Sequence, residues 1–175
     1  MADSSSPGSF PADGLALMAG TMEGLKRLFP SRFWPAVWLT GGTVRDALLG
    51  RGGRDIDLAA SVPAGLLEGL GFRHVAGRST APVWLRHFPE LGGVEITLLE
   101  SPAALGDDLA RRDFTINAMA LSLLGELADP MGGRSHLGMG ALHPCSDRIF
   151  REDPLRLFRA FRFCAEGFSL SRGLC

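Results

Sequence analysis

The sequence is poor in lysine and cysteine and has no long hydrophobic run. Lys26 is the only lysine, so nearly all of the positive charge is carried by arginine. The 3 cysteines show no Cys-x-x-Cys spacing, which indicates neither a disulfide framework nor a zinc site, and we expect reduced thiols. No segment approaches the roughly 20 apolar residues of a membrane span, and the N-terminus lacks a signal-peptide pattern. The sequence therefore predicts a cytoplasmic protein without a membrane partner.

The balance of charge excludes a uniformly basic surface. The net charge is -1 at pH 7 over 175 residues, of which 46% are hydrophobic. This composition is typical of a globular protein with no global attraction for nucleic acid. The length allows one domain, or one domain and the start of a second. Residues 1–14 are rich in Ser, Pro, Gly and Asp, which predicts a disordered tail.

Two acidic residues define the most informative segment. Asp55 and Asp57 lie in the stretch GRDIDLAAS, which predicts a strand, so both carboxylates share one face while Ile56 and Leu58 point to the other. Paired like charges beside an apolar layer repel each other and resist desolvation. A divalent cation relieves both penalties, and Mg²⁺ is the first choice because it prefers oxygen ligands and shares them with phosphates. The sequence therefore predicts a magnesium site with phosphate groups close by.

A glycine pair precedes these acids. Gly41 and Gly42 end a short apolar strand, and residues 43–49 predict a short helix. The free amides and the positive dipole end of such a helix can face an anion, to which Arg45 in the first turn adds a cation. A glycine pair by itself also fits a plain strand-turn-helix. Its position about a dozen residues before Asp-x-Asp favours the phosphate site.

A third acidic residue, Glu95, lies among aliphatic residues in the predicted strand 94–98. An isolated glutamate in such a strand is more often an outward-facing surface residue. Beside Asp55 and Asp57 it would instead serve as a metal ligand or as the base for an attacking hydroxyl. The pairing of the strands decides between these alternatives, and the sequence leaves both open.

A charged cluster interrupts an apolar segment in the middle of the chain. Arg111, Arg112 and Asp113 are followed by Phe114 and Ile116, so the segment should be half-buried and its charges need partners. A solvated charge cluster is one interpretation. A triphosphate held by Arg112 is the other.

The last third of the sequence predicts a helix that begins near Asp153, because Pro154 is accepted only in a first turn. On a helical wheel, Asp153, Arg156 and Arg159 share a polar arc. The apolar arc holds Leu157, Phe158, Phe161 and Cys164.

Two roles fit the polar arc. As a helix cap with ion pairs one turn apart, it would contribute only about 0.3 kcal/mol per pair. Alternatively, an aspartate accepts from an exocyclic amine and an arginine donates to a ring nitrogen, which is the pattern shared by cytosine and adenine. Guanine and uracil present the opposite pattern. Asp153 and Arg156 would then accept C and A and exclude G and U.

Three ordered motifs resemble those of the class II tRNA nucleotidyltransferases and bacterial poly(A) polymerases. The stretch GGTVRDALLGRGGRDIDLA from Gly41 is similar to GGxVRDxLLGxxxxDxDxA, RRDFTINAMA from Arg111 to RRDFTxNAxA, and EDPLRLFRAFRF from Glu152 to EDxxRxxRxxRF. The resemblance implies an α+β fold, with a mixed nucleotidyltransferase sheet of the DNA polymerase β type and flanking helices. It implies a head domain at residues 15–144 and the start of a helical neck, an RNA- and nucleotide-binding domain, at residues 145–175.

The resemblance also implies a role for each matching residue. Asp55 and Asp57 match the metal-binding aspartates, and Glu95 falls where members have a third strand acid. The phosphates and sugar of the nucleotide would be held by Gly41, Gly42, Arg45 and Arg112. The incoming base would be read by Asp153 and Arg156, with Arg159 and Arg162 as further nucleotide contacts.

The implied reaction is the Mg²⁺-dependent transfer of CMP or AMP from CTP or ATP to an RNA 3'-hydroxyl, with tRNA as the expected RNA. The connection from Ile96 to Asp108 is shorter than in CCA-adding members, whose loop assists the change from C to A addition. CCA-, CC- and A-adding and poly(A) activities are therefore alternatives. Members continue beyond the position of Cys175, so we expect a fragment that binds RNA weakly on its own.

Two rival hypotheses stand beside the transferase. The chain would be a non-catalytic nucleotide- or RNA-binding module derived from this fold, or a structural fragment with an incomplete core. Against the first, a degenerate module has no need to keep Asp55 and Asp57 on one strand face. The sequence leaves the oligomeric state undetermined.

Overall fold

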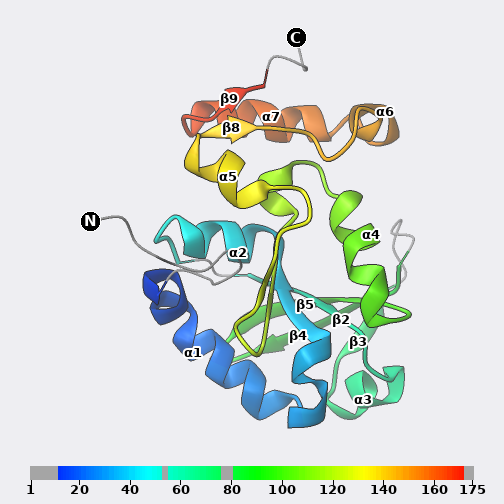
Figure 1. Ribbon diagram of the computed structural model, residues 1–175. Coiled ribbons are helices and arrows are strands. Elements are labelled where there is room, and N and C mark those ends of the chain that lie inside the picture. The colour runs from blue at the N-terminus through cyan, green and yellow to red at the C-terminus, as the bar shows by residue number, and fades with distance from the viewer. Residues whose placement is uncertain (1–11, 53–54, 76–80, 172–175) are drawn as a thin grey trace. The chain divides into compact units, whose positions relative to one another are not determined.

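The computed structural model describes residues 12–52, 55–75 and 81–171 (Figure 1). Most of the predicted tail at residues 1–14 lies outside this part of the chain. The chain divides into two compact units. The first comprises Met1–Leu105 and Ala120–Ala128, and the second comprises Gly106–Met119 and Asp129–Cys175. The domain boundary expected after residue 144 stays a prediction.

The first unit is built on a mixed sheet, as predicted. Its strands lie in the order β3-β4-β5-β2-β1-β6-β7. The pair β2 and β5 is parallel, and the other neighbouring pairs are antiparallel. The strands are β1 (Val37–Thr40), β2 (Ile56–Ala60), β3 (Arg73–Val75), β4 (Val83–Phe88), β5 (Gly92–Leu98), β6 (Ala120–Ser122) and β7 (Leu127–Ala128).

The helices of the first unit follow local signals in the sequence. The apolar face of the first helix is buried at Met18, Met22, Leu25 and Phe29, which recur at three- and four-residue steps. The helices are α1 (Ala12–Leu28), η1 (Ser31–Ala36), α2 (Gly41–Leu48), α3 (Ala64–Gly69) and η2 (Pro102–Ala104). Gly50, which follows α2, has a positive φ of 69° and ends that helix.

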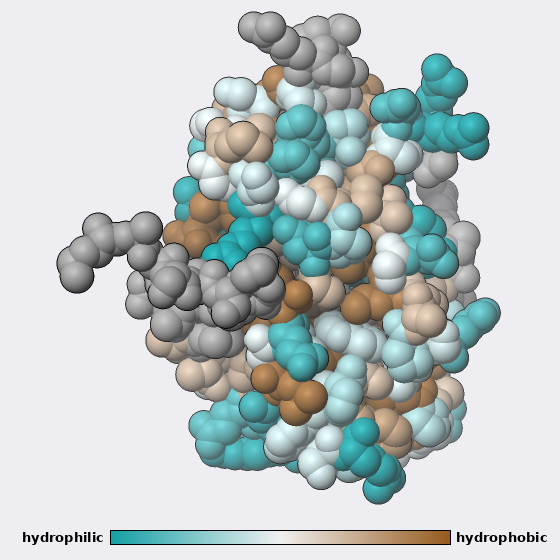
Figure 2. Space-filling model, in the orientation of Figure 1, coloured by the Kyte–Doolittle hydropathy of each residue, from teal (hydrophilic) through white to brown (hydrophobic). Residues whose placement is uncertain are grey.

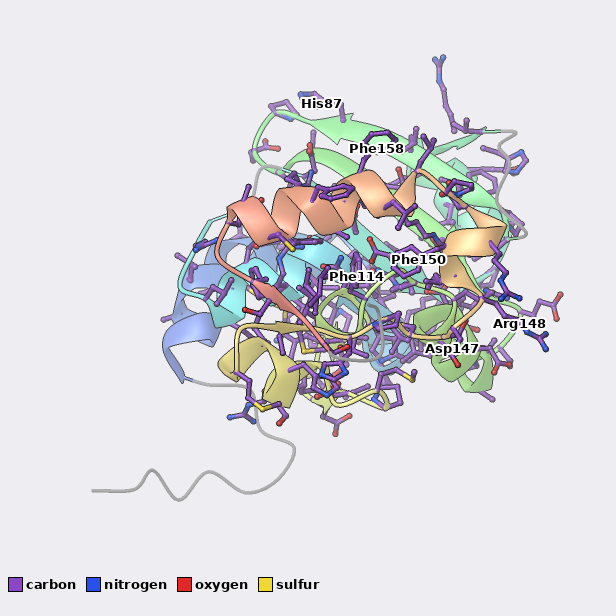
Figure 3. The ribbon with its side chains drawn as sticks, turned by 90° about the horizontal axis from the view of Figure 1, so that it is seen from above. His87, Phe114, Asp147, Arg148, Phe150 and Phe158 are labelled. Atoms are coloured by element: carbon purple, nitrogen blue, oxygen red, sulfur yellow. The ribbon has the colours of Figure 1, made fainter. Side chains whose placement is uncertain are left out.

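The second unit is mainly helical. Its elements are η3 (Thr115–Asn117), α5 (Gly133–Gly138), β8 (Ala141–Leu142), α6 (Ile149–Glu152), α7 (Arg156–Ala165) and β9 (Ser169–Leu170), and α4 (Leu105–Ala110) begins at the boundary with the first unit. An aromatic cluster forms its core. Phe114 and Phe163 are fully buried with ring centroids 5.7 Å apart, and Phe150 lies 6.0 Å from Phe114. Figure 3 shows Phe114 and Phe150 on the same side of α7.

The helix predicted from Asp153 begins later, at Arg156. Asp153 is extended, with φ −147°, and its Oδ1 accepts a hydrogen bond from the Leu155 N–H at 3.0 Å. This local bond offers the backbone an alternative to the helix, so Pro154 lies in a turn between α6 and α7. The predicted starting point was therefore wrong.

The side of α7 that carries much of the apolar arc is largely exposed. Phe158 is 72% exposed and Phe161 71%, whereas Ala160 and Phe163 are buried. The helix is turned in this way because Phe163 fills the aromatic core and Arg159 pairs with a buried acid on the same side. In Figure 3, Phe158 lies on the opposite side of α7 from Phe114.

No helix of the described residues is long and apolar enough to span a bilayer. On the face shown in Figure 2, apolar and polar residues of the described chain are interspersed.

The first residue of α5 provides a sharp test of the packing in the second unit. A Cβ at Gly133 would lie 2.1 Å from the backbone carbonyl oxygen of Thr115 and 3.0 Å from the side chain of Met119. A backbone atom cannot move aside cheaply, so we expect Gly133→Ala to lower the free energy of unfolding by about 2 kcal/mol or more. Urea denaturation followed by circular dichroism measures the change.

Gly138, at the other end of the same helix, is the matched control. Nothing lies within 4 Å of the position of its Cβ. Gly138→Ala should therefore leave the free energy of unfolding unchanged or raise it by about 0.5 kcal/mol. Equal losses in the two variants would contradict the described packing of α5 on η3.

Candidate functional site

Strands β2 and β5 bring the three predicted acids to one open face of the first unit. Their parallel register pairs Asp57 directly with Glu95. Asp55 lies two residues before Asp57, so its side chain is on the same face. Ile56 and Val94 are also paired, and both are buried on the opposite face. The strand pairing thus places Glu95 beside Asp57, and its role as a metal ligand or base stays a prediction.

The acids line an open pocket of about 650 Å³ within the first unit. A glycine keeps part of this pocket clear, because the Asp55 Oδ1 lies 3.7 Å from the position that a Cβ on Gly93 would take. Larger residues at that position would extend toward the carboxylate. The pocket continues from the acids over β4 to β3, where Arg73 and His87 also line it.

Two threonines hold the start of β2. The Thr43 hydroxyl donates to the Asp55 carbonyl oxygen at 3.2 Å and accepts from the Asp57 N–H at 3.3 Å. Thr40, which is fully buried, donates its hydroxyl proton to the Asp57 carbonyl oxygen at 3.3 Å. The turn from β1 into α2 is thereby tied to the strand of acids. Sequence analysis missed both threonines, because a hydroxyl beside a glycine pair does not indicate which strand it will meet.

The glycine turn forms as predicted, but α2 begins at Gly41 rather than Thr43. Gly41 has a positive φ of 65°, which a side chain rarely adopts. A Cβ on Gly42 would lie 3.4 Å from Nη2 of Arg45, so the guanidinium packs over the first turn. The Arg45 Nε donates to Asp46 Oδ1 at 2.9 Å. The cation expected at this helix N-terminus is therefore fixed near the glycine pair.

The acids fit a metal that is shared with a substrate better than one enclosed by protein. In the part of the chain that the structure describes, no group of three or more His, Cys, Asp or Glu side chains is arranged to hold a metal ion. Mg²⁺, however, is usually bound by one or two carboxylates together with substrate phosphates. Asp57 and Glu95 on neighbouring strands, with Asp55 on the same face, supply hard oxygen donors of this kind.

In the second unit, hydrogen bonds converge on a buried acid. The Asp113 side chain is 2% exposed. Its Oδ1 accepts from the Phe114 N–H at 2.8 Å and from the Asn117 side-chain amide at 2.9 Å, and its Oδ2 accepts from the Arg159 Nη1 at 3.0 Å. A buried carboxylate requires such partners. The signal in the sequence was a lone acid in an apolar segment, which indicates a need for partners without naming them.

The predicted nucleotide-binding arginines have acidic neighbours in the same unit. Arg159 pairs with Asp113, as described above. Arg112 donates from Nη2 to Asp108 Oδ2 at 3.1 Å, and the Arg162 Nε lies 3.7 Å from Glu166 Oε1. These contacts orient the guanidinium groups, and their predicted roles toward a nucleotide stay predictions.

Asp153 and Arg156 lie together, as the base-reading prediction requires. The Arg156 Nε is 3.7 Å from Asp153 Oδ2, and the side chains are 21% and 44% exposed for the arginine and the aspartate. Within the described residues, Nη1 of Arg156 is buried and has no hydrogen-bond partner. An unsatisfied buried donor costs about 1–3 kcal/mol, so this atom is suited to an acceptor on a ligand.

The thiol of Cys145 lies close enough to several charged side chains of this unit for them to shift its pKa. The pKa of the Cys145 thiol is raised to about 12, first by burial and then by the negative charge of Asp113, while Arg112 and Arg156 act in the opposite direction. The three charged side chains therefore act on the same thiol. The thiol is neutral at physiological pH, so Cys145 contributes packing rather than a nucleophile.

Comparisons with known proteins identify the family of the chain. Residues 86–143 match the family described as Poly A polymerase head domain. The CC-adding tRNA nucleotidyltransferase of Halalkalibacterium halodurans is 37% identical over 143 residues, covering 78% of this chain and 36% of that protein. The CC-adding enzyme of Geobacter sulfurreducens is 40% identical, covering 73% and 31%, and the A-adding enzyme of Deinococcus radiodurans is 38% identical, covering 75% and 30%.

Solved structures show the same fold. A CCA-adding enzyme in complex with ATP matches with a TM-score of 0.75 at 27% identity, covering 93% of this chain and 43% of that chain. A tRNA-processing enzyme with CTP matches with a TM-score of 0.66 at 34% identity, covering 78% and 40%. The chain spans about a third of the length of the curated relatives it matches. It belongs to the family of class II tRNA nucleotidyltransferases and bacterial poly(A) polymerases, and corresponds to the N-terminal head region of its members.

Proposed function

We propose that this chain is the catalytic head of an Mg²⁺-dependent nucleotidyltransferase that adds CMP, AMP or both to an RNA 3'-end, with tRNA as the RNA. The observation that carries the proposal is the direct pairing of Asp57 with Glu95 on an open face, beside a glycine turn at the start of α2. The relatives named above include CC-adding and A-adding enzymes, so the proposal covers both nucleotides.

The residues of the first unit would carry the phosphate chemistry. Asp55 and Asp57 would hold Mg²⁺, which when bound activates the attacking oxygen and neutralises charge on the leaving group. Glu95 would complete the set of acids, as a further oxygen ligand or as the acceptor of the proton from the attacking 3'-hydroxyl. The backbone amides at Gly41 and Gly42, together with Arg45, would hold the phosphates of CTP or ATP.

The residues of the second unit would choose the base. The Arg156 Nη1 would donate to the ring nitrogen of cytosine or adenine, which satisfies a donor that the described chain leaves unpaired. Asp153 would accept from the exocyclic amine, because a carboxylate accepts several hydrogen bonds and Oδ1 already accepts one from the Leu155 N–H. Arg112, Arg159 and Arg162 would contribute further contacts to the nucleotide.

The metal assignment predicts the effect of removing one charge. Asp57→Asn keeps the volume of the side chain but weakens the Mg²⁺ site. Mg²⁺ should therefore tighten CTP binding less in the variant. The ratio of the Kd without Mg²⁺ to the Kd with Mg²⁺ should be at least about tenfold smaller than in the native chain. Binding in EDTA should be unchanged. Isothermal titration calorimetry with and without Mg²⁺ measures both quantities.

Glu100→Gln is the control for this variant, because Glu100 is exposed, follows β5 and does not line the pocket. Its Kd values for CTP with and without Mg²⁺ should equal those of the native chain.

The same three proteins are then given labelled CTP or ATP and a tRNA that lacks its 3'-end. If the native chain transfers the labelled nucleotide to the tRNA and Asp57→Asn does not, the result supports a catalytic role for the chain. Nucleotide binding that is equal in all three proteins and independent of Mg²⁺ would contradict the proposed function.

The base-reading assignment predicts a preference among nucleotides. The native chain should bind ATP and CTP more tightly than GTP and UTP, and Arg156→Ala should bind all four with similar affinity. The loss for ATP and CTP should be about tenfold, the effect of removing one buried donor to a ring nitrogen. Calorimetric titration of each nucleotide with Mg²⁺ gives the four Kd values.

Arg111→Ala is the matched control, since Arg111 is 53% exposed and lies 3.6 Å from Asp108 in the same unit. Its nucleotide preference should equal that of the native chain. If the native chain binds the four nucleotides equally, the roles of Asp153 and Arg156 are wrong.

A further inference from the structure

The open face of the first unit continues from the acids across two further strands. Leu85 pairs with Glu95, and Arg73 pairs with Leu85. Directly paired residues share a face, so one row across the sheet reads Asp57, Glu95, Leu85, Arg73. With neighbouring strands about 4.8 Å apart, the Cα atom of Arg73 lies about 14 Å from that of Asp57.

A second row runs parallel to the first. His87 pairs with Gly93, and the Asp55 carboxylate faces Gly93. Because glycine has no side chain, nothing from this position of β5 stands between Asp55 and His87. Asp55, His87 and Arg73 line the same pocket.

The far side of this pocket combines a cation, a hydrogen-bond donor and apolar surface. Arg73 and His87 are exposed, and neither forms an ion pair or side-chain hydrogen bond with the described part of the chain. Val75 and Leu85, on the same face, are each 40% exposed. Single-stranded nucleic acid binds to surfaces of this kind, because its phosphates pair with basic side chains while its sugars and bases cover apolar ones.

The order of the strands places the glycine turn and this exposed surface on opposite sides of the acids. Strand β1, which leads into the glycine turn of α2, borders β2 on one side, whereas β4 and β3 lie beyond β5 on the other. Figure 1 shows α2 and β3 toward opposite ends of the sheet. In the proposed function the glycine turn takes the phosphates, including the leaving pyrophosphate. In-line displacement requires the attacking oxygen to come from the side opposite the leaving group.

We propose that the face of β3, β4 and β5 holds the 3'-terminal segment of the acceptor RNA, with Arg73 and His87 as positioning residues for a backbone phosphate. Leu85 and Val75 contact the ribose or base of the same segment. The 3'-hydroxyl then reaches the acids from the β4 side. The bond broken is that between the α- and β-phosphates of the nucleotide, the bond formed joins the 3'-oxygen to the α-phosphate, and the proton leaves to Glu95 or water. This inference rests on the proposed function.

The experiment follows the methyl groups of the surface itself. The 175-residue chain, labelled at Leu and Val methyl groups, is titrated by NMR with a short single-stranded RNA that ends in a free 3'-hydroxyl. The signals of Val75 and Leu85 should shift progressively as the RNA binds. Arg73→Ala should weaken binding about threefold to tenfold and should reduce the slope of log K against log salt by about 0.7, the effect of one lost phosphate contact.

Three further variants make the result specific. Arg73→Lys should keep the native salt slope, because the charge is retained. Arg32→Ala, at an exposed arginine of η1 that does not line the pocket, should change nothing. His87→Ala should weaken RNA binding about threefold while keeping the salt slope closer to native than Arg73→Ala does. If Arg73→Ala alters the methyl spectrum away from the pocket, His87→Ala takes its place as the test variant.

The outcomes separate this inference from the proposed function. If ATP and CTP bind with Mg²⁺ but RNA leaves Val75 and Leu85 unmoved, the acceptor surface is wrong and the proposed function stands. Shifts confined to Leu157 of α7 and to Leu155, which precedes that helix, would place the RNA on the second unit and overturn the inference. If neither nucleotides nor RNA bind to the folded chain, both proposals are wrong.

Discussion

The parallel pairing of β2 with β5 is the constraint on which the first unit depends. One register sets Ile56 opposite Val94 in the core and Asp57 opposite Glu95 on the open face. A slip of one residue would carry the acids of β2 inward and its apolar side chains outward. Burial of the core therefore enforces the position of the acids, and the hydroxyls of Thr40 and Thr43 fix the same strand from its other side.

In the second unit, the buried carboxylate of Asp113 holds the elements in position. Asp113 accepts hydrogen bonds from Arg159 and Asn117, and so links α7 to the segment that contains η3. With Arg159 and Phe163 engaged, α7 carries its Arg156 guanidinium partly buried, with Nη1 available for a ligand. The same rotation exposes Phe158 and Phe161. The proposed base recognition would therefore use a side of α7 adjacent to the one that holds the helix in place.

The sequence predicted the elements whose signals are local. The glycine pair indicated the turn that opens α2, and the Asp-x-Asp alternation placed both carboxylates on one face. The position of Glu95 could not be predicted, because strand pairing is set by contacts between distant segments. Hydrophobic periodicity also did not show which side of α7 is buried, since it identifies apolar residues such as Phe158 without showing whether the core meets them.

The central claim is that Asp55, Asp57 and Glu95 form one site for a metal shared with the nucleotide. The most direct test replaces Mg²⁺ with paramagnetic Mn²⁺ in the presence of CTP and records the backbone amide spectrum of the chain. The strongest signal broadening should fall on these three acids and their strand neighbours. Strongest broadening elsewhere, for example at the stacked rings of His136 and His143, would contradict it.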